Sequence, residues 1–241
     1  EIVAVFQRSL ERQGGRFYVG QTVKEVAWDG VSSVVARLAN GMAVKSEKML
    51  VALGRQPNVE ELNLEAAGLS LNEKGLLPAN DHGQTAVPHI FAAGDILGRP
   101  PALASQAMED GRRAVCHALG LPVGESANLV PVGIYTIPEI ASIGLNEEQA
   151  GARYRGPLVG RAPFTEIAKG QITGGCEGLL KLIADPSGER LLGVQIVGEN
   201  ATELVHLGQL ALQDGTNIDR FIDTIFGFPT FAEAYRVAAL D

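Results

Sequence analysis

Cysteine and histidine are scarce in this sequence, which has two and four of them in 241 residues. Cys116 and Cys176 lie too far apart for a local redox pair or a metal knuckle, so we expect two buried free thiols and a reducing compartment. The histidines are His82, His89, His117 and His206. No two of them have metal-ligand spacing on one predicted element, and the sequence therefore predicts no metal site.

The sequence also has fewer basic than acidic residues, and it has no long apolar run. The sequence has 20 Lys and Arg residues against 28 Asp and Glu, a formal net charge of −8. Neither nucleic acid nor an anionic membrane attracts an acidic protein. Asp or Arg interrupts every apolar run before it reaches the ~20 residues that cross a bilayer, and no signal peptide is recognisable. We therefore expect no nucleic-acid partner and no membrane.

The sequence does have the composition of an ordinary soluble globular protein, with 46% hydrophobic and 20% charged residues. Its length allows one large domain or two small ones with a substantial core. The chain begins with Glu1 and enters a helical pattern, Ile2 to Leu10, without a capping residue. We therefore expect it to be cut from something longer.

The first 45 residues predict a helix followed by short strands. Residues 1–13 place apolar side chains on one helical face, and a short strand is expected at 16–19. Three strand-like runs follow within residues 23–45, separated by Asp29-Gly30 and Asn40-Gly41. These two dipeptides are strong hairpin signals, so the runs predict an antiparallel meander.

Two apolar runs further on predict strands of another kind. Residues 48–53 and 89–92 are typical of strands that are buried on both faces of a parallel sheet. A helix is expected over Ala102–Leu119. Residues 120–128, rich in Gly, Pro and Ser, have the composition of a linker.

From Val130 the pattern changes to strands of an antiparallel sheet and then to helices. The five strands are expected at 133–136, 140–144, 158–164, 178–184 and 191–197. The three closing helices are expected at 201–213, 218–225 and 229–240. Asp185–Gly188 has the residues of a hairpin turn between the last two strands.

The most specific local signal is the run Thr85-Ala-Val-Pro-His-Ile-Phe-Ala-Ala-Gly-Asp95. A buried strand that ends in Ala-Gly-Asp puts the bare backbone of Gly94, and then the Asp95 carboxylate, at the strand end where open α/β sheets bind ligands. A carboxylate there can accept hydrogen bonds from sugar or ribitol hydroxyls. Downstream, Pro100–Ala104 starts a helix whose free N–H groups and positive dipole end face the same crevice.

The C-terminal run Phe226-Gly-Phe-Pro-Thr-Phe-Ala-Glu-Ala-Tyr235 resembles a catalytic motif that has lost its catalytic residue. In flavin disulfide reductases, His-Pro-Thr is followed by Glu three residues after the Thr. Here Pro229, Thr230 and Glu233 are in register, but Phe228 occupies the His position. A benzyl group carries no proton, so a dithiol has no general acid or base here. The same residues also fit a helix that starts at Pro229 and closes a domain.

Together these motifs resemble those of the pyridine nucleotide–disulfide oxidoreductases. Thr85–Asp95 is similar to their second flavin-binding motif, and Val51–Asn58 is similar to the strand that ends their nicotinamide domain. The resemblance implies α/β and α+β structure, with partial FAD/NAD(P)-binding Rossmann-like segments followed by an α+β dimerisation domain with an antiparallel sheet. The implied domains are 1–57 (end of the NAD(P)-binding domain), 58–125 (returning FAD segment) and 126–241 (dimerisation).

The resemblance also implies roles for individual residues. Gly94 and Asp95 bind FAD, Asp95 through the ribitol hydroxyls. Ala102, Leu103 and Ala104 lie under the isoalloxazine, and Gly54 leaves room near the nicotinamide nucleotide. Two further residues have open roles. Arg55 lies beside the nucleotide or serves as a structural ion-pair residue. Glu233 has no His to orient, so it caps a helix or forms a structural pair. The implied cofactors are FAD and NAD(P).

Within the family, three segments are most similar to the soluble Si-specific NAD(P)+ transhydrogenases. These are Gly133–Ile140, Val159–Ala162 and Phe228–Leu240. In those enzymes, too, the residue before the Pro is not His, which matches cytoplasmic hydride transfer from NADPH through flavin to NAD+ without a thiol base. The resemblance further implies a homodimer through 126–241, which Tyr235 and Arg236 could help to form, and a cis Phe228–Pro229 bond.

The sequence departs from the complete family pattern because it has no Gly-x-Gly-x-x-Gly fingerprint in a strand-to-helix context. We therefore expect the C-terminal half of such an enzyme, without its N-terminal FAD/NAD(P) domains, inactive alone and holding no tightly bound FAD. Two alternatives stay open. One is a disulfide reductase similar to dihydrolipoyl dehydrogenase, in which Phe228 is a substitution. The other is a non-catalytic dimerisation fragment, with Ile90 and Phe91 lacking packing partners.

Overall fold

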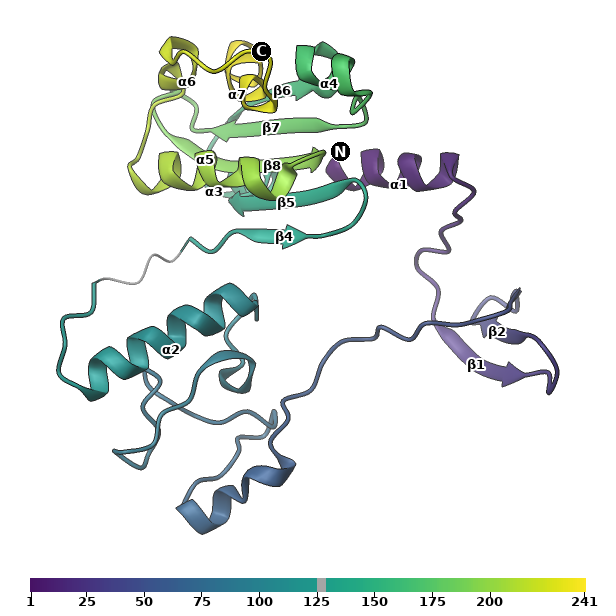
Figure 1. The fold of residues 1–241 in the computed structure, drawn as a ribbon, viewed down its shortest axis with the longest axis vertical. Coiled ribbons are helices and arrows are strands. Elements are labelled where there is room, and N and C mark those ends of the chain that lie inside the picture. The colour runs from purple at the N-terminus through teal and green to yellow at the C-terminus, as the bar shows by residue number, and fades with distance from the viewer. Residues whose placement is uncertain (125–128) are drawn as a thin grey trace.

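The computed structural model describes residues 1–124 and 129–241, and its elements gather into three groups (Figure 1). The predicted boundary between residues 125 and 126, and the end of the predicted linker 120–128, lie outside the described residues. An extended segment, residues 47–59, joins the first group to the second. Across the described ranges, every helix is too short or too polar to cross a bilayer.

The first group is a small sheet of β1 (Val23–Trp28), β2 (Val34–Leu38) and β3 (Ala43–Ser46). The helix α1 (Ile2–Arg12) precedes it in the sequence but packs on the third group (Figure 1). The strands pair in the order β1-β2-β3, all antiparallel, which confirms the predicted meander. At the first turn, Asp29 Oδ1 accepts the backbone N–H groups of residues 31, 32 and 33. These donors, that of Ser33 above all, hold the pKa of Asp29 well below its ordinary range.

Three predicted strands are wrong. Residues 16–19, 48–53 and 89–92 form no strand, and the last contributes only one isolated bridge, between Gln84 and Phe91. Leu53, expected to be buried, is 95% exposed. A strand forms only where a neighbour satisfies its backbone donors and acceptors, and the described part of the chain places no strand beside these runs.

The second group is built around α2 (Ala104–Ala118), with three 3-10 turns at Glu60–Leu62, Leu64–Ala67 and Gly94–Leu97. A small core of Leu69, Leu77 and Ala92 holds it together. The expectation that Ile90 and Phe91 lack partners is wrong. Ile90 packs on this core, and the Phe91 ring meets the ring of His117 edge-on at 6.1 Å.

The third group is a five-stranded antiparallel sheet in the order β4-β5-β8-β7-β6, which confirms the predicted sheet. The strands are β4 (Val132–Ile134), β5 (Glu139–Gly144), β6 (Leu158–Pro163), β7 (Leu179–Ala184) and β8 (Leu191–Gly198). The helices are α3 (Glu147–Arg153), α4 (Ala168–Thr173), α5 (Ala201–Gln213), α6 (Asp219–Asp223) and α7 (Ala234–Leu240). The turn at Asp185–Gly188 lies between β7 and β8, as predicted.

Side chains alternate between the two faces of this sheet because successive residues of a strand point to opposite sides. On β7, Leu180 and Leu182 join the main core, which α5 and α7 cover. Leu179 packs against α1, and Ile183 packs against α3. Every residue of β7 is therefore buried, and α1 lies on the third group although it belongs to the other end of the sequence (Figure 1).

The alternation also buries a charge, because Lys181 lies between Leu179 and Ile183 on the face that α1 and α3 cover. Its ammonium group is 2.7 Å from Glu1 at the start of α1 and is also bonded to Glu147 in the first turn of α3. Arg161, directly opposite on β6, lies 3.0 Å from Glu1 and 3.7 Å from Glu147. Two cations and two carboxylates thus balance one another where two helices meet the sheet.

We expect the Glu1 carboxylate to make α1 docking pH-dependent. The hydrogen bonds from Lys181 and Arg161 lower the pKa of Glu1 from 4.5 to about 2. A depressed carboxyl pKa stabilises the folded state above the unfolded value and loses that effect as pH falls through the folded value. The stability gap between the chain and Glu1→Gln should therefore be constant above about pH 5 and close towards pH 2.

Urea unfolding of both proteins between pH 7 and pH 2 measures this gap. Glu25→Gln is the matched control, because Glu25 forms only an exposed ion pair at 3.5 Å with Arg37. We expect that variant to stay within about 0.5 kcal/mol of the unaltered chain at pH 7. A gap for Glu1→Gln that is unchanged at pH 2 contradicts the prediction.

Candidate functional site

Gly94 and Asp95 begin the 3-10 turn Gly94–Leu97, which contacts α2. Gly94 has φ +81°, and a Cβ built on it would lie 3.0 Å from the Cβ of Ala107, so the position favours glycine for conformation and for space. Its N–H donates to Asp110 Oδ2 at 3.3 Å. The carboxylate of Asp110, on the inner face of α2, thereby fixes the turn. Sequence reasoning missed Asp110, although an acidic residue in the middle of a predicted helix was a signal.

The start of α2 lies beside this turn. The helix begins at Ala104, two residues later than predicted, because Ala102 has φ +58° and Leu103 is the extended N-cap residue. Among the described residues, no side chain caps this end. The first N–H groups of a helix have no partner within the helix, so they remain free as donors at the positive end of its dipole.

Arg55 connects the Gly94–Leu97 turn to the start of α2. Its Nη1 lies 3.1 Å from Asp95 Oδ2, and its Nη2 donates to the carbonyl of Ala102 at 2.7 Å. Of the two roles left open for Arg55, the structure shows the ion pair. The neighbouring Gly54 is exposed with φ +111°, and a Cβ on it would meet no described atom within 4 Å. Its place beside a nicotinamide nucleotide stays a prediction.

These residues fit the ribitol and flavin end of FAD. The Asp95 side chain is 42% exposed, so its carboxylate remains accessible to hydroxyl donors, and the α2 N–H groups lie open nearby. A neighbouring cavity of about 960 Å³ extends from Arg99 and Ser105 past Gln106 towards α5, and none of Gly94, Asp95 and residues 102–104 lines it. Two buried atoms at this cavity, His82 Nδ1 and Gln106 Oε1, have no hydrogen-bond partner in the described structure. Such atoms favour a polar occupant.

The C-terminal motif lies on the third group, away from Asp95. Phe228 is 75% exposed, and its bond to Pro229 is cis, as the resemblance implies. The helical structure begins at Phe231, not at Pro229 as predicted, because Thr230 acts as the N-cap. The Glu233 carboxylate accepts the N–H of Thr230 at 3.2 Å, and the two form a capping box. This confirms that Glu233 has a structural role.

Tyr235 is fully buried, so it cannot reach a partner subunit. Its hydroxyl donates to the carbonyl of Leu204 at 2.7 Å and accepts the N–H of Gly208 at 3.1 Å. These two groups are four residues apart in α5, so the hydroxyl inserts into one rung of that helix. Burial raises the pKa of Tyr235 well above its ordinary value. The residue joins α7 to α5 and has no access to a substrate.

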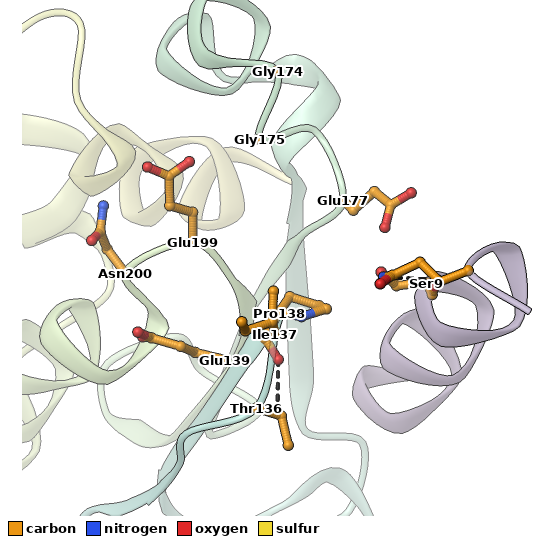
Figure 2. A pocket seen from close by; sticks show the side chains of 11 residues that line it. Ser9, Thr136, Ile137, Pro138, Glu139, Gly174, Gly175, Glu177, Glu199 and Asn200 are labelled. Carbon is orange, nitrogen blue, oxygen red and sulfur yellow. Dashed lines mark hydrogen bonds between the residues drawn. The ribbon is translucent and has the colours of Figure 1, made fainter. Parts of the chain in front are cut away.

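A second cavity, of about 440 Å³, lies between α1 and the loops of the third group (Figure 2). None of the predicted site residues lines it. Its three carboxylates already have partners in the protein: Glu139 accepts from Thr202, Glu177 pairs with Arg12 and Glu199 accepts from Thr173. Of the three, only Glu177 is paired with a cation, whereas Glu139 and Glu199 accept hydrogen bonds from neutral groups.

Among the described residues, the thiols and imidazoles belong to no cluster that could hold a metal ion. Cys116 and Cys176 are free, and they are partly rather than fully buried. His82 and His117 stack face to face at 4.2 Å, a contact that their distance in sequence concealed. His206 pairs with Gln209 on the surface of α5.

Two family models match the chain. "Pyridine nucleotide-disulphide oxidoreductase" matches residues 1–111, and "Pyridine nucleotide-disulphide oxidoreductase, dimerisation domain" matches residues 130–239. Curated relatives include the soluble pyridine nucleotide transhydrogenase of Mycobacterium bovis (strain BCG / Pasteur 1173P2), 39% identical over 100% of this chain and 51% of the relative. That of Marinomonas sp. (strain MWYL1) is 43% identical over 86% of this chain and 45% of the relative. The chain thus spans about half the length of these relatives.

Solved structures share the arrangement of the three groups. The crystal structure of LpdA from Mycobacterium tuberculosis is 26% identical, with a TM-score of 0.86 over 98% of this chain and 51% of that one. The HOCl-induced flavoprotein disulfide reductase RclA from Escherichia coli is 23% identical, with a TM-score of 0.91 over 99% of this chain and 55% of that one. Because the identity to RclA is only 23%, this second likeness shows the fold alone.

We expect Tyr235→Phe to lower the free energy of unfolding by about 1–2 kcal/mol, because it leaves the Leu204 carbonyl and the Gly208 N–H without their bridging hydroxyl. Thermal unfolding of the chain measures the loss. Tyr154→Phe is the matched control, because Tyr154 is a partly buried tyrosine whose hydroxyl makes no hydrogen bond to the described residues. Equal stability of the two variants contradicts the assignment.

Proposed function

This chain belongs to the pyridine nucleotide-disulphide oxidoreductase family, and we propose that it forms the C-terminal half of a soluble, FAD-dependent pyridine nucleotide transhydrogenase of the Si-specific class. The observation that carries the proposal is Phe228. The resemblance puts a proton-carrying His at this position in enzymes that reduce disulfides, and an aromatic hydrocarbon cannot replace it. Hydride transfer between two nicotinamides needs no such group. The identity of 39–43% to soluble transhydrogenases over most of the chain supports the same choice.

The residues of the chain bind and orient in this proposal, and none of them moves a proton. Asp95 accepts hydrogen bonds from the ribitol hydroxyls of FAD, and Gly94 lets the backbone make its turn against α2. Ala102, Leu103 and Ala104 lie under the isoalloxazine, where the free N–H groups and dipole of α2 favour negative charge. When bound, FAD supplies the hydride acceptor and donor between NADPH and NAD+. Gly54 leaves space near the nicotinamide nucleotide.

We propose three functional segments. Residues 1–57 end the NAD(P)-binding domain, 58–125 return to the FAD-binding domain, and 126–241 form a homodimer in the cytoplasm. The dimerisation-domain match supports the last of these. So do the exposed apolar side chains of that segment, which need a cover. The most exposed of them are Tyr135, Ile137, Ile225 and Phe228. In the dimer, Phe228 of one subunit faces the flavin of the other.

The proposal is tested on the intact polypeptide by stopped-flow spectroscopy. We expect NADPH to bleach the flavin absorbance and NAD+ to restore it, with no long-wavelength charge-transfer band at any time. A thiolate beside the flavin produces such a band, and its appearance would place the protein among the disulfide reductases. Phe228→Leu, which also carries no proton, should retain the hydride-transfer rate within about threefold, well short of the 10²-fold or larger loss that removal of an acid or base causes.

A separate expectation concerns the 241-residue chain alone. Its described residues provide the carboxylate and the helix N-terminus, but the sequence has no glycine-rich loop to hold the pyrophosphate. We therefore expect purified chain to carry no stoichiometric FAD and to show no transhydrogenase activity. The ratio of absorbance at 450 nm to protein, about zero in this case, is the measurement. A yellow chain with one FAD per molecule would refute the expectation.

A further inference from the structure

We propose that Arg55 is a positioning residue of the flavin site, which sets Asp95 and the N-terminus of α2 in fixed relation to each other. This inference rests on the proposed function, because it concerns the same carboxylate and the same helix end. Arg55 comes from neither element. It lies within the extended segment 47–59, and contacts residues 40 and 47 positions further along the chain.

The two contacts of Arg55 differ in kind. Nη1 makes an ion pair with the Asp95 carboxylate at 3.1 Å, and Nη2 donates to the neutral carbonyl of Ala102 at 2.7 Å. A guanidinium group is rigid and planar, so its two Nη atoms hold two acceptors at a set distance and angle. Lysine offers a single point charge and cannot span both. The geometry of the pair therefore depends on arginine.

Both acceptors belong to short turns that lie outside the α-helices and strands. Asp95 lies in a 3-10 turn, and Ala102 has φ +58°, a conformation that disfavours residues with a Cβ. Ala102 is held by the N–H bond that it donates to Arg99 and by the bond that its carbonyl accepts from Arg55. Loss of Arg55 should release this turn, and with it the direction in which the first N–H groups of α2 point.

The ion pair also leaves Asp95 able to bind a hydroxyl. Arg55 contacts Oδ2, and a carboxylate has about four lone-pair sites. Arg55 holds the carboxylate in one orientation through Oδ2 and leaves other lone pairs open. A flavin hydroxyl and Arg55 can therefore share Asp95, and the affinity for FAD gains from an acceptor that is already oriented.

The test compares Arg55→Met with Arg112→Met in the intact polypeptide. Arg112 is a matched control, because it forms an ion pair at 2.6 Å with Glu109 on α2, and neither Asp95 nor Ala102 is among its hydrogen-bond or ion-pair partners in the described structure. Titration of the apoprotein with FAD, followed by quenching of flavin fluorescence, should show affinity about tenfold weaker for Arg55→Met and unchanged for Arg112→Met. Arg55→Lys should recover only part of the loss. The flavin reduction potential should shift for the Arg55 variants alone.

A second readout needs no flavin. In the 241-residue chain, amide hydrogen exchange at residues 94–104 should be faster in Arg55→Met and unchanged in Arg112→Met. Faster exchange with unchanged FAD affinity overturns the positioning role, as do equal FAD affinities of the two Met variants. If the unaltered polypeptide binds no FAD at all, the proposed function fails. The exchange experiment then still reports whether Arg55 holds the turn.

Discussion

The burial of one ammonium group governs how this chain is assembled. Lys181 points to the face of the sheet where solvent is excluded, and a buried charge needs carboxylates. Those carboxylates come from the first residue of α1 and the first turn of α3. The helix that starts the chain must therefore dock on a sheet formed almost two hundred residues later. The meander, the segment 47–59 and Arg55 follow this docked helix along the chain, so the ion pair between Arg55 and Asp95 is made by a segment that starts from the large sheet.

Elements whose pattern and pairing partner are both encoded nearby in the sequence are predicted correctly. The prediction is wrong for runs that need a strand from elsewhere to pair with. Asp29-Gly30 and Asn40-Gly41 define the meander, and the alternation along β7 and β8 defines the large sheet, because both patterns are local. Residues 48–53 have an equally clear strand composition but no ladder to join. The candidate site shows the same division. Gly94 and Asp95 were identifiable from their motif, whereas the partners Arg55 and Asp110 depend on contacts across 40 and 16 positions.

The candidate site and the C-terminal region depend on different kinds of side chain. In the candidate site the features that matter are a carboxylate, a glycine and an uncapped helix end. In the C-terminal region they are aromatic rings, since Phe231 stacks on Phe164 at 4.8 Å and Tyr235 stacks on Phe221 at 5.0 Å. The first region remains open to a ligand, and the second forms the compact base on which an exposed motif can be presented.

The capping box of Thr230 and Glu233, which follows Phe228, has an evolutionary consequence. Thr230 and Glu233 close the start of the helix by themselves, and the ring of Phe231 anchors it, so the backbone at Phe228 is held without help from the Phe228 side chain. An exposed position of this kind can exchange residues at little cost in stability. A lineage could therefore gain or lose proton transfer here by one substitution, and inherit the rest of the scaffold unaltered.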